Sequence, residues 1–183
     1  MGIKLFGKNI AQVYTHHIMK IDYDAVHNKP ECDYVLHKID TDRIAETLAP
    51  IGTTVTVSNL KRLISKNKNL CEGFIFGEMG GYQIGTIWVM YKGADDPEYR
   101  IRDIDAYIFD VFVNEQFRGR GYAGEMIRQL MEYLHEKGID AAHLAVAKTN
   151  KSAIRAYEKT GFIPVSDKKF ARILKINIPY HKL

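Results

Sequence analysis

The chain has 183 residues, 46% of them hydrophobic, and its 26 Lys and Arg against 22 Asp and Glu give a net charge of +4. These values fit a single packed domain, 1–183, and exclude disordered, collagen-like and low-complexity chains. Two cysteines, Cys32 and Cys71, are too few for a disulfide framework or a four-cysteine zinc site, so we expect free thiols.

Location and partners follow from the same composition. No apolar run approaches the roughly 20 residues of a membrane span, and the N-terminus lacks the apolar core of a signal peptide. We therefore expect a cytoplasmic protein with no membrane partner. The basic residues are spread along the chain without zinc-finger or basic-zipper spacing, so we expect no nucleic-acid partner.

The first half of the chain predicts two strands and two short helices. The strands are expected at 12–23 and 34–39, where apolar and β-branched residues alternate with polar ones. One helix is expected to start at Thr41 or Asp42 and to run to Leu48. A second is expected to be capped by Ser58 or Asn59. Residues 1–50 resemble no family segment and form an idiosyncratic N-terminal part.

The middle of the chain predicts a hairpin followed by a long strand. Aromatic and β-branched runs at 74–76 and 82–91 flank Gly80-Gly81, which supply the positive φ of a tight turn. A loop at 92–98 leads to a strand at 101–113. This strand changes from alternation to the continuous run Val111-Phe-Val113, which indicates burial on both faces or a bulge.

The last third alternates between helices and strands. Apolar residues from Ala123 to Leu134 recur at helical spacing, and Gly138 ends that helix. A buried strand at 142–147 leads to a helix capped by Asn150 and ended by Gly161. Strands are expected at 162–165 and 170–178. The fold class is therefore α/β, with a mixed and mostly antiparallel central sheet flanked by helices.

A glycine-rich loop, Arg118-Gly-Arg-Gly-Tyr-Ala-Gly124, lies between a strand end and a strong helix. The first N–H groups of a helix have no intrahelical partner, and the helix dipole is positive there. Glycines allow a ligand to approach the backbone closely. The loop therefore predicts an anion site, with a phosphate or diphosphate as its ligand. Glu125 would repel phosphate, so we expect its side chain to point away.

The segment Arg118-x-x-Gly121-x-Ala123 resembles the Arg/Gln-x-x-Gly-x-Gly/Ala signature of the GNAT superfamily of acyl-CoA-dependent N-acyltransferases. The segment from Asn150 to Phe162 resembles the second conserved block of that family. Both blocks occur in the family's order, and residues 74–162 form the best-matching core. The resemblance implies a GNAT-like sheet with a splayed central strand pair.

The resemblance also implies acetyl-CoA as the acyl donor and a set of residues that bind it. Backbone groups of a splayed strand would pair with the pantetheine amides, and the glycine loop would bind the diphosphate. The cofactor-binding residues implied are Val111, Phe112, Val113, Arg118, Gly119, Arg120, Gly121, Tyr122, Ala123, Gly124 and Asn150. Asn150 has a second interpretation as a plain helix N-cap, and both roles are compatible.

Tyr157 stands where the family places a tyrosine that protonates the leaving thiolate. A phenol with a pKa near 10 is protonated at neutral pH and is able to donate that proton. The alternative interpretation is an aromatic residue of the core. The attacking amine must lose a proton, and the candidates for the base are Asp103, Asp105, Asp110 or a chain of water molecules. Strand alternation places Asp110 on the opposite face unless a bulge intervenes.

The function expected is an N-acetyltransferase that passes an acetyl group directly from acetyl-CoA to a primary amine. The acceptor is expected to be a small metabolite or amino sugar, with a protein N-terminus or lysine as the alternative. A non-catalytic acyl-CoA sensor is the alternative from another class. No metal is expected, because His16-His17 would point to opposite faces of a strand. A homodimer remains open.

Overall fold

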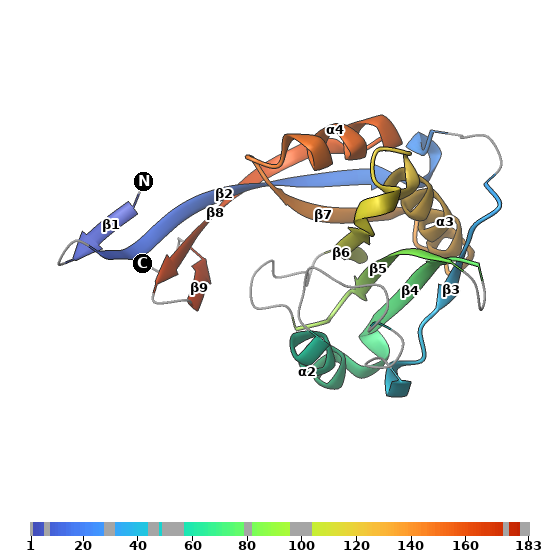
Figure 1. The fold of residues 1–183 in the computed structure, drawn as a ribbon, viewed down its shortest axis with the longest axis horizontal. Helices are drawn as coiled ribbons and strands as arrows, with labels where there is room; N and C mark the ends of the chain where they lie inside the picture. Colours follow the sequence, from blue (N-terminus) through green and yellow to red (C-terminus); the bar gives the residue numbers. More distant parts are fainter. Residues whose placement is uncertain are drawn as a thin grey trace.

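The computed structural model describes residues 2–5, 8–27, 32–43, 48, 57–78, 82–95, 104–173 and 176–179 (Figure 1). The helices are α2 (Val57–Asn67), α3 (Tyr122–Glu136) and α4 (Lys151–Thr160). The strands are β1 (Gly2–Leu5), β2 (Lys8–Asp22), β3 (Val35–Lys38), β4 (Cys71–Gly77), β5 (Gln83–Tyr91), β6 (Ala106–Val113), β7 (Ala141–Ala147), β8 (Ile163–Ile173) and β9 (Ile176–Pro179).

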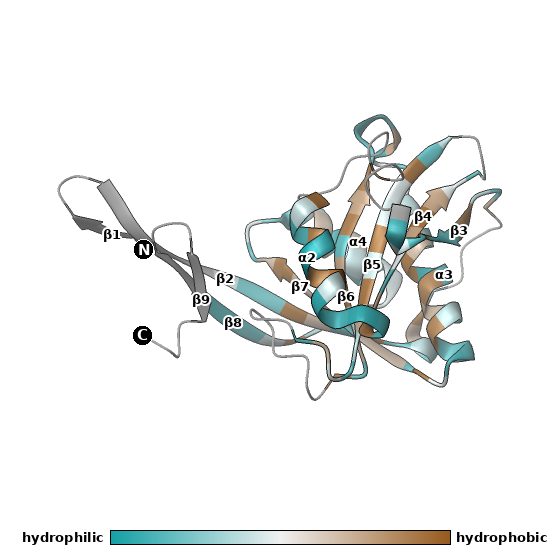
Figure 2. Cartoon of the chain, turned by 90° about the horizontal axis from the view of Figure 1, so that it is seen from below, coloured by the Kyte–Doolittle hydropathy of each residue, from teal (hydrophilic) through white to brown (hydrophobic). Residues whose placement is uncertain are grey.

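All of these strands join one nine-stranded sheet in the order β3-β4-β5-β6-β7-β2-β8-β9, with β1 paired to β2. Every pair is antiparallel except β6 with β7. Helices α3 and α4 lie on one face and α2 lies on the other, as Figure 2 shows from below. The expected fold class, a mixed and mostly antiparallel sheet flanked by helices, is confirmed.

Strand β2, although it lies near the start of the sequence, is an inner strand of the sheet between β7 and β8. It pairs with β8 from Ala11↔Ile173 to Lys20↔Ile163. The prediction of two separate strands at 162–165 and 170–178 is therefore wrong. The polar residues in the middle of β8 suggested a break between two strands. Hydrogen bonds to β2 hold the whole of β8 in one extended strand, and β9 is a separate strand that follows it.

The helix starts were predicted with mixed success. Because α2 begins at Val57, Ser58 and Asn59 lie inside its first turn and not at the N-cap position that was expected for them. Thr41–Arg43 forms a single 3₁₀ turn, and residues 44–47 lie outside the described residues. For α4 the prediction is confirmed, since Asn150 caps the helix by accepting a hydrogen bond from the Ala153 N–H.

The hairpin predicted in the middle of the chain is confirmed as β4 and β5, while its turn at 79–81 lies outside the described residues. The indole of Trp88 on β5 lies across Gly73 on β4, where a Cβ would come within 2.4 Å of the ring. This close approach explains a glycine inside a buried strand. The strand expected at 101–113 begins only at Ala106, and 101–103 lie outside the described residues.

Glu72 on β4 is hydrogen-bonded to side chains of the neighbouring strands β3 and β5 and of helix α3 and the residue that follows it. Its carboxylate accepts hydrogen bonds from the ammonium groups of Lys38 and Lys137 at 2.6 and 3.1 Å, and from the hydroxyls of Tyr91 and Tyr133. Only 12% of the side chain is exposed. Burial alone would raise the pKa of Glu72, but these donors outweigh it and lower the pKa to about 2.

Acid should therefore destabilise the protein partly through Glu72. A folded-state pKa of about 2, below the usual value of the unfolded chain, gives stability that is present above pH ~4.5 and lost as the pH falls toward 2. The full loss is about 3 kcal/mol. Urea unfolding at pH 7 and pH 3 should show about 2 kcal/mol of this loss, because pH 3 is still above the folded-state pKa of Glu72. Glu72→Gln should be less stable at pH 7 and should lose less on acidification than the wild type. Equal losses in both proteins would contradict this assignment.

Candidate functional site

The sheet opens between its only parallel neighbours among the described strands. β6 and β7 pair at Tyr107↔His143 and Ile108↔Leu144 and then diverge. Beyond this point, residues 109–113 of β6 remain paired with β5 on one side, whereas β7 no longer pairs with them on the other side. The expected splayed strand pair is therefore present, and one edge of β6 faces a cleft. Such an edge is able to pair with an extended amide chain.

A bulge lies in β6 at this opening. Trp88 pairs with Phe109 and Thr86 pairs with Phe112, so two residues of β6, Asp110 and Val111, stand opposite one residue of β5. Asp110 has a φ of +49°, a left-handed conformation that Asp and Asn adopt more readily than most residues. Of the two explanations offered for the sequence pattern of this strand, the bulge is confirmed.

The glycine loop follows β6 and leads into α3. Gly119 and Gly121 have φ values of +78° and +84°, and Gly121 is the N-cap of the helix. The first intrahelical bonds go from the N–H groups of Gly124 and Glu125 to the Gly121 carbonyl. The N–H groups of Tyr122 and Ala123 come before these bonds, in the part of a helix where N–H groups have no intrahelical partner. The Arg118 Nε donates to the Val113 carbonyl at 3.0 Å and ties the loop to β6.

Helix α4 forms the opposite wall. Asn150 at its N-cap accepts hydrogen bonds from the Ala153 N–H and from the Ser152 hydroxyl. Tyr157 packs its ring against Phe162, with the ring centroids 5.7 Å apart. Burial raises the pKa of Tyr157 to about 12, and the negative charge of Asp110 adds to this shift. The phenol is therefore protonated throughout the physiological range.

Between these walls lies a cleft of about 690 Å³. It brings together nearly all of the residues predicted from the sequence, namely Val111, Phe112, Val113, Arg118, Gly119, Gly121, Tyr122, Ala123, Gly124, Asn150 and Tyr157. Arg120 is the exception, because it is not a lining residue and its guanidinium lies over the Phe117 ring at 5.8 Å. The cleft has an apolar strand wall and a backbone-rich loop, which fits an extended ligand with an anionic end.

The sequence reasoning missed four cationic or titratable residues that line the cleft: His27, Arg128, Arg155 and Lys159. Arg155 and Lys159 stand four residues apart on α4, a spacing that places both on one face and was available as a signal. His27 gave no such signal, because it reaches the cleft through tertiary contacts. Its ring Nδ1 lies 2.9 Å from the Lys159 carbonyl at the end of α4.

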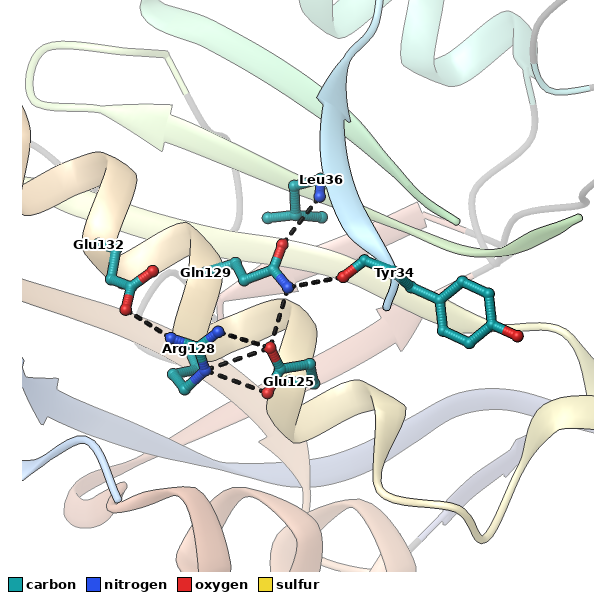
Figure 3. Close-up of polar contacts among 6 residues, drawn as sticks. All are labelled: Tyr34, Leu36, Glu125, Arg128, Gln129 and Glu132. Atoms are coloured by element: carbon teal, nitrogen blue, oxygen red, sulfur yellow. Dashed lines mark hydrogen bonds and ion pairs between the residues drawn. The ribbon is translucent and has the colours of Figure 1, made fainter. Parts of the chain in front are cut away.

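Glu125 also lines the cleft, and Figure 3 shows how its carboxylate is held. The side chain of Arg128 contacts both carboxylate oxygens, with Nη2 at 2.6 Å from Oε1 and Nε at 3.1 Å from Oε2. The Gln129 amide donates to Oε1 at 2.9 Å. The carboxylate that was expected to point away from the anion site is thus paired with a neighbouring cation.

The three carboxylates considered as the base are separated by the structure. Asp103 lies outside the described residues. Asp105 is exposed just before β6 begins, and its carboxylate is 3.6 Å from the ammonium of Lys92. Asp110 stands at the bulge, close enough to Tyr157 to influence its pKa. Asp110 is the candidate that the fold brings to the opening between β6 and β7.

Other kinds of site have little support in the described part of the chain. No group of three or more metal-ligating side chains occurs there. His17 binds Asp167 through Nδ1 at 2.8 Å. Cys32 and Cys71 are free thiols, and burial raises the pKa of Cys71 to about 12. None of the described helices is long and apolar enough to cross a membrane.

Comparison with known proteins adds a family assignment. The model of the acetyltransferase (GNAT) family matches residues 53–162. An uncharacterized N-acetyltransferase of Methanocaldococcus jannaschii is 32% identical over 91 residues, which cover 50% of this chain and 39% of that protein. Mycothiol acetyltransferase of Corynebacterium aurimucosum is 31% identical over 78 residues, which cover 43% of this chain and 24% of that enzyme. The matches thus span less than half the length of these relatives.

A solved structure shares the fold. The crystal structure of a predicted acetyltransferase with acetyl-CoA from Clostridium acetobutylicum superimposes with a TM-score of 0.51, covering 73% of this chain and 92% of that one. The two sequences are 20% identical over this region. At this level of identity the likeness concerns the fold.

Proposed function

The chain belongs to the acetyltransferase (GNAT) family, and from this premise we propose that it transfers an acetyl group directly from acetyl-CoA to a primary amine. The observation that carries the proposal is the convergence on one cleft of the open edge of β6, the start of α3 and Tyr157 of α4. A strand edge suits the pantetheine amides, and a helix start suits the diphosphate.

All of the residues predicted to bind the acyl donor except Arg120 line this cleft. Val111, Phe112 and Val113 offer backbone groups, and the loop from Arg118 to Gly124 offers N–H groups together with the cation of Arg118. Asn150 lies beside them, although its side-chain oxygen is already engaged in capping α4. In this proposal acetyl-CoA supplies the acetyl thioester, and no metal takes part.

Two side chains are proposed to move protons. Tyr157 holds its proton firmly at neutral pH and donates it to the departing sulfur. Asp110 accepts the proton that the amine must lose in order to attack the acetyl carbon. The bulge supports this role, because it gives Asp110 a conformation that a regular strand would not provide. Left-handed residues in strands often mark functional positions.

Asp110→Asn should lower kcat by about 10- to 100-fold at pH 7, which is at or below the lower limit of the usual range for general base catalysis, because water is able to substitute in part. Asparagine tolerates the left-handed conformation, so the bulge is preserved. The matched control is Asp105→Asn on the same segment, which should retain the wild-type kcat because its carboxylate faces Lys92. An Asp110→Asn variant with wild-type turnover would assign the proton transfer to water.

The acceptor that we propose is the primary amine of a small metabolite or amino sugar. CoA release is to be measured with a thiol reagent against small amines, amino sugars, lysine peptides and free peptide N-termini. Turnover that is confined to peptides would replace the small-molecule proposal. Tight acetyl-CoA binding without turnover on any amine would identify a sensor instead of an enzyme.

A further inference from the structure

The first turn of α3 carries an acidic residue where an anion is proposed to bind. Glu125 follows the glycine loop directly, lines the cleft and is only 3% exposed. A carboxylate in the first turn suits the helix dipole. The same charge opposes a diphosphate at the same helix end, since like charges repel strongly in a partly desolvated site.

Arg128, one turn further along α3, pairs with this carboxylate. Its guanidinium contacts Oε1 and Oε2 of Glu125 and also binds Glu132 on the other side (Figure 3). The Arg128 side chain is 22% exposed and that of Glu125 4%, so the pair is largely shielded from water. Removing one partner of such a pair leaves the other charge buried without compensation.

We propose that Arg128 is a positioning residue for the acyl donor, acting through Glu125 by neutralising a carboxylate that would otherwise repel the diphosphate. This inference rests on the proposed function of the cleft. Arg128 itself lines the cleft, but Nε, Nη1 and Nη2 all donate to Glu125 or Glu132. Each nitrogen of the guanidinium is thus engaged by a carboxylate, and the proposal assigns the effect of Arg128 on the ligand to its pairing with Glu125.

Gln129 extends this arrangement into the N-terminal part of the chain. Its amide donates to Glu125 and to the Tyr34 carbonyl, both at 2.9 Å, and its oxygen accepts from the Leu36 N–H at 2.9 Å. Tyr34 and Leu36 precede the family match at 53–162. The start of β3, which no family motif covers, thus helps to orient the carboxylate beside the anion site.

The test is a double-variant cycle read out by ligand affinity. The Kd of CoA is measured by titration calorimetry for the wild type, Arg128→Met, Glu125→Gln and the double variant. The Kd of pantetheine, which lacks the diphosphate, is measured by NMR titration. Arg128→Met should weaken CoA binding roughly 10- to 100-fold while leaving the Kd of pantetheine unchanged. The double variant should regain most of the lost CoA affinity.

Glu132→Gln is the matched control, because it removes the other carboxylate from the same guanidinium at an exposed position outside the cleft lining. It should leave the Kd of CoA unchanged. A double variant that binds CoA as weakly as Arg128→Met would overturn the proposal and assign a direct phosphate contact to Arg128. Equal losses for CoA and pantetheine would overturn it in favour of a structural role.

Two further measurements, on Glu125→Gln alone and on the wild type, cover the cases in which Arg128→Met does not fold or CoA does not bind. Should Arg128→Met fail to fold, Glu125→Gln with Arg128 intact decides the question, since the proposal expects CoA binding at least as tight as in the wild type. Weaker binding in that variant would overturn it. A wild-type protein that does not bind CoA contradicts the proposed function of the cleft, and this outcome is distinct from all of the above.

Discussion

Gly121→Val should abolish acetyl-CoA binding, with a loss in affinity of 100-fold or more, while the protein remains folded. Gly121 is the N-cap of α3 with a φ of +84°, and it sets the path of the loop past the helix start. A β-branched residue at this φ is strained by about 1–2 kcal/mol. We expect the loop to move in order to relieve this strain, and the N–H groups at the start of α3 would then be displaced from the ligand.

The chain offers a matched control for this variant at the other end of the same helix. Gly138 has a φ of +77°, and a Cβ there would meet no atom within 4 Å. Gly138→Val should therefore carry a similar strain and lower the melting temperature similarly, yet bind acetyl-CoA normally. The stabilisation of each variant by acetyl-CoA in thermal melts gives the answer. Normal stabilisation of Gly121→Val would place the binding site elsewhere.

Tyr157→Phe should lower kcat by about 10- to 1000-fold with little change in the KM for acetyl-CoA. The proton transfer to sulfur is made in the transition state, so its loss affects turnover and not ground-state binding. A thiolate is a good leaving group and water is able to substitute in part, which places the effect in the lower part of the range. Phenylalanine retains the ring that packs against Phe162.

Three other outcomes are distinguishable for this variant. A purely structural tyrosine would give a lower melting temperature with normal turnover per folded molecule. A sensor would give no turnover in either protein while binding acetyl-CoA equally well. The third outcome is wild-type kcat in Tyr157→Phe with a good amine acceptor, and it would remove this side chain from the mechanism.

The parts of the fold that the sequence predicts well are those decided by local signals. The spacing of apolar residues predicts helices α3 and α4, and Asn150 and Gly161 predict the two ends of α4. The glycine loop was placed correctly for the same reason, since its position between a strand and a helix is a local property. Asn150 and Tyr157 face the same cleft because they share the inward side of α4.

The parts that the sequence does not predict depend on long-range pairing. The polar stretch in the middle of β8 does not indicate a strand, and only its hydrogen bonds to β2 make it one. The left-handed conformation of Asp110 follows from the mismatch between β5 and β6, which alternation alone does not reveal. The pairing of Glu125 with Arg128 could be predicted from their i,i+3 spacing on a helix. That both residues line the cleft could not be predicted, because it depends on the tertiary structure.

The position of β2 has a consequence for how the chain reaches this fold during synthesis. β2 emerges early, whereas β7 and β8, which flank it, are made last but for β9. At ~5–20 residues per second, the parts of β2 that pair with β7 and β8 wait for these partners at least while residues 23–140 are translated, whereas β1, which pairs with residues 8–12 of β2, is already made. On refolding of the full chain, pulse-labelled hydrogen exchange should show protection of the β4–β5 hairpin before that of β2, because the two strands of the hairpin are neighbours in the sequence and the partners of β2 are distant. Until β7 and β8 have been made, the edge groups of β2 that they cover in the fold are exposed to pairing with other chains.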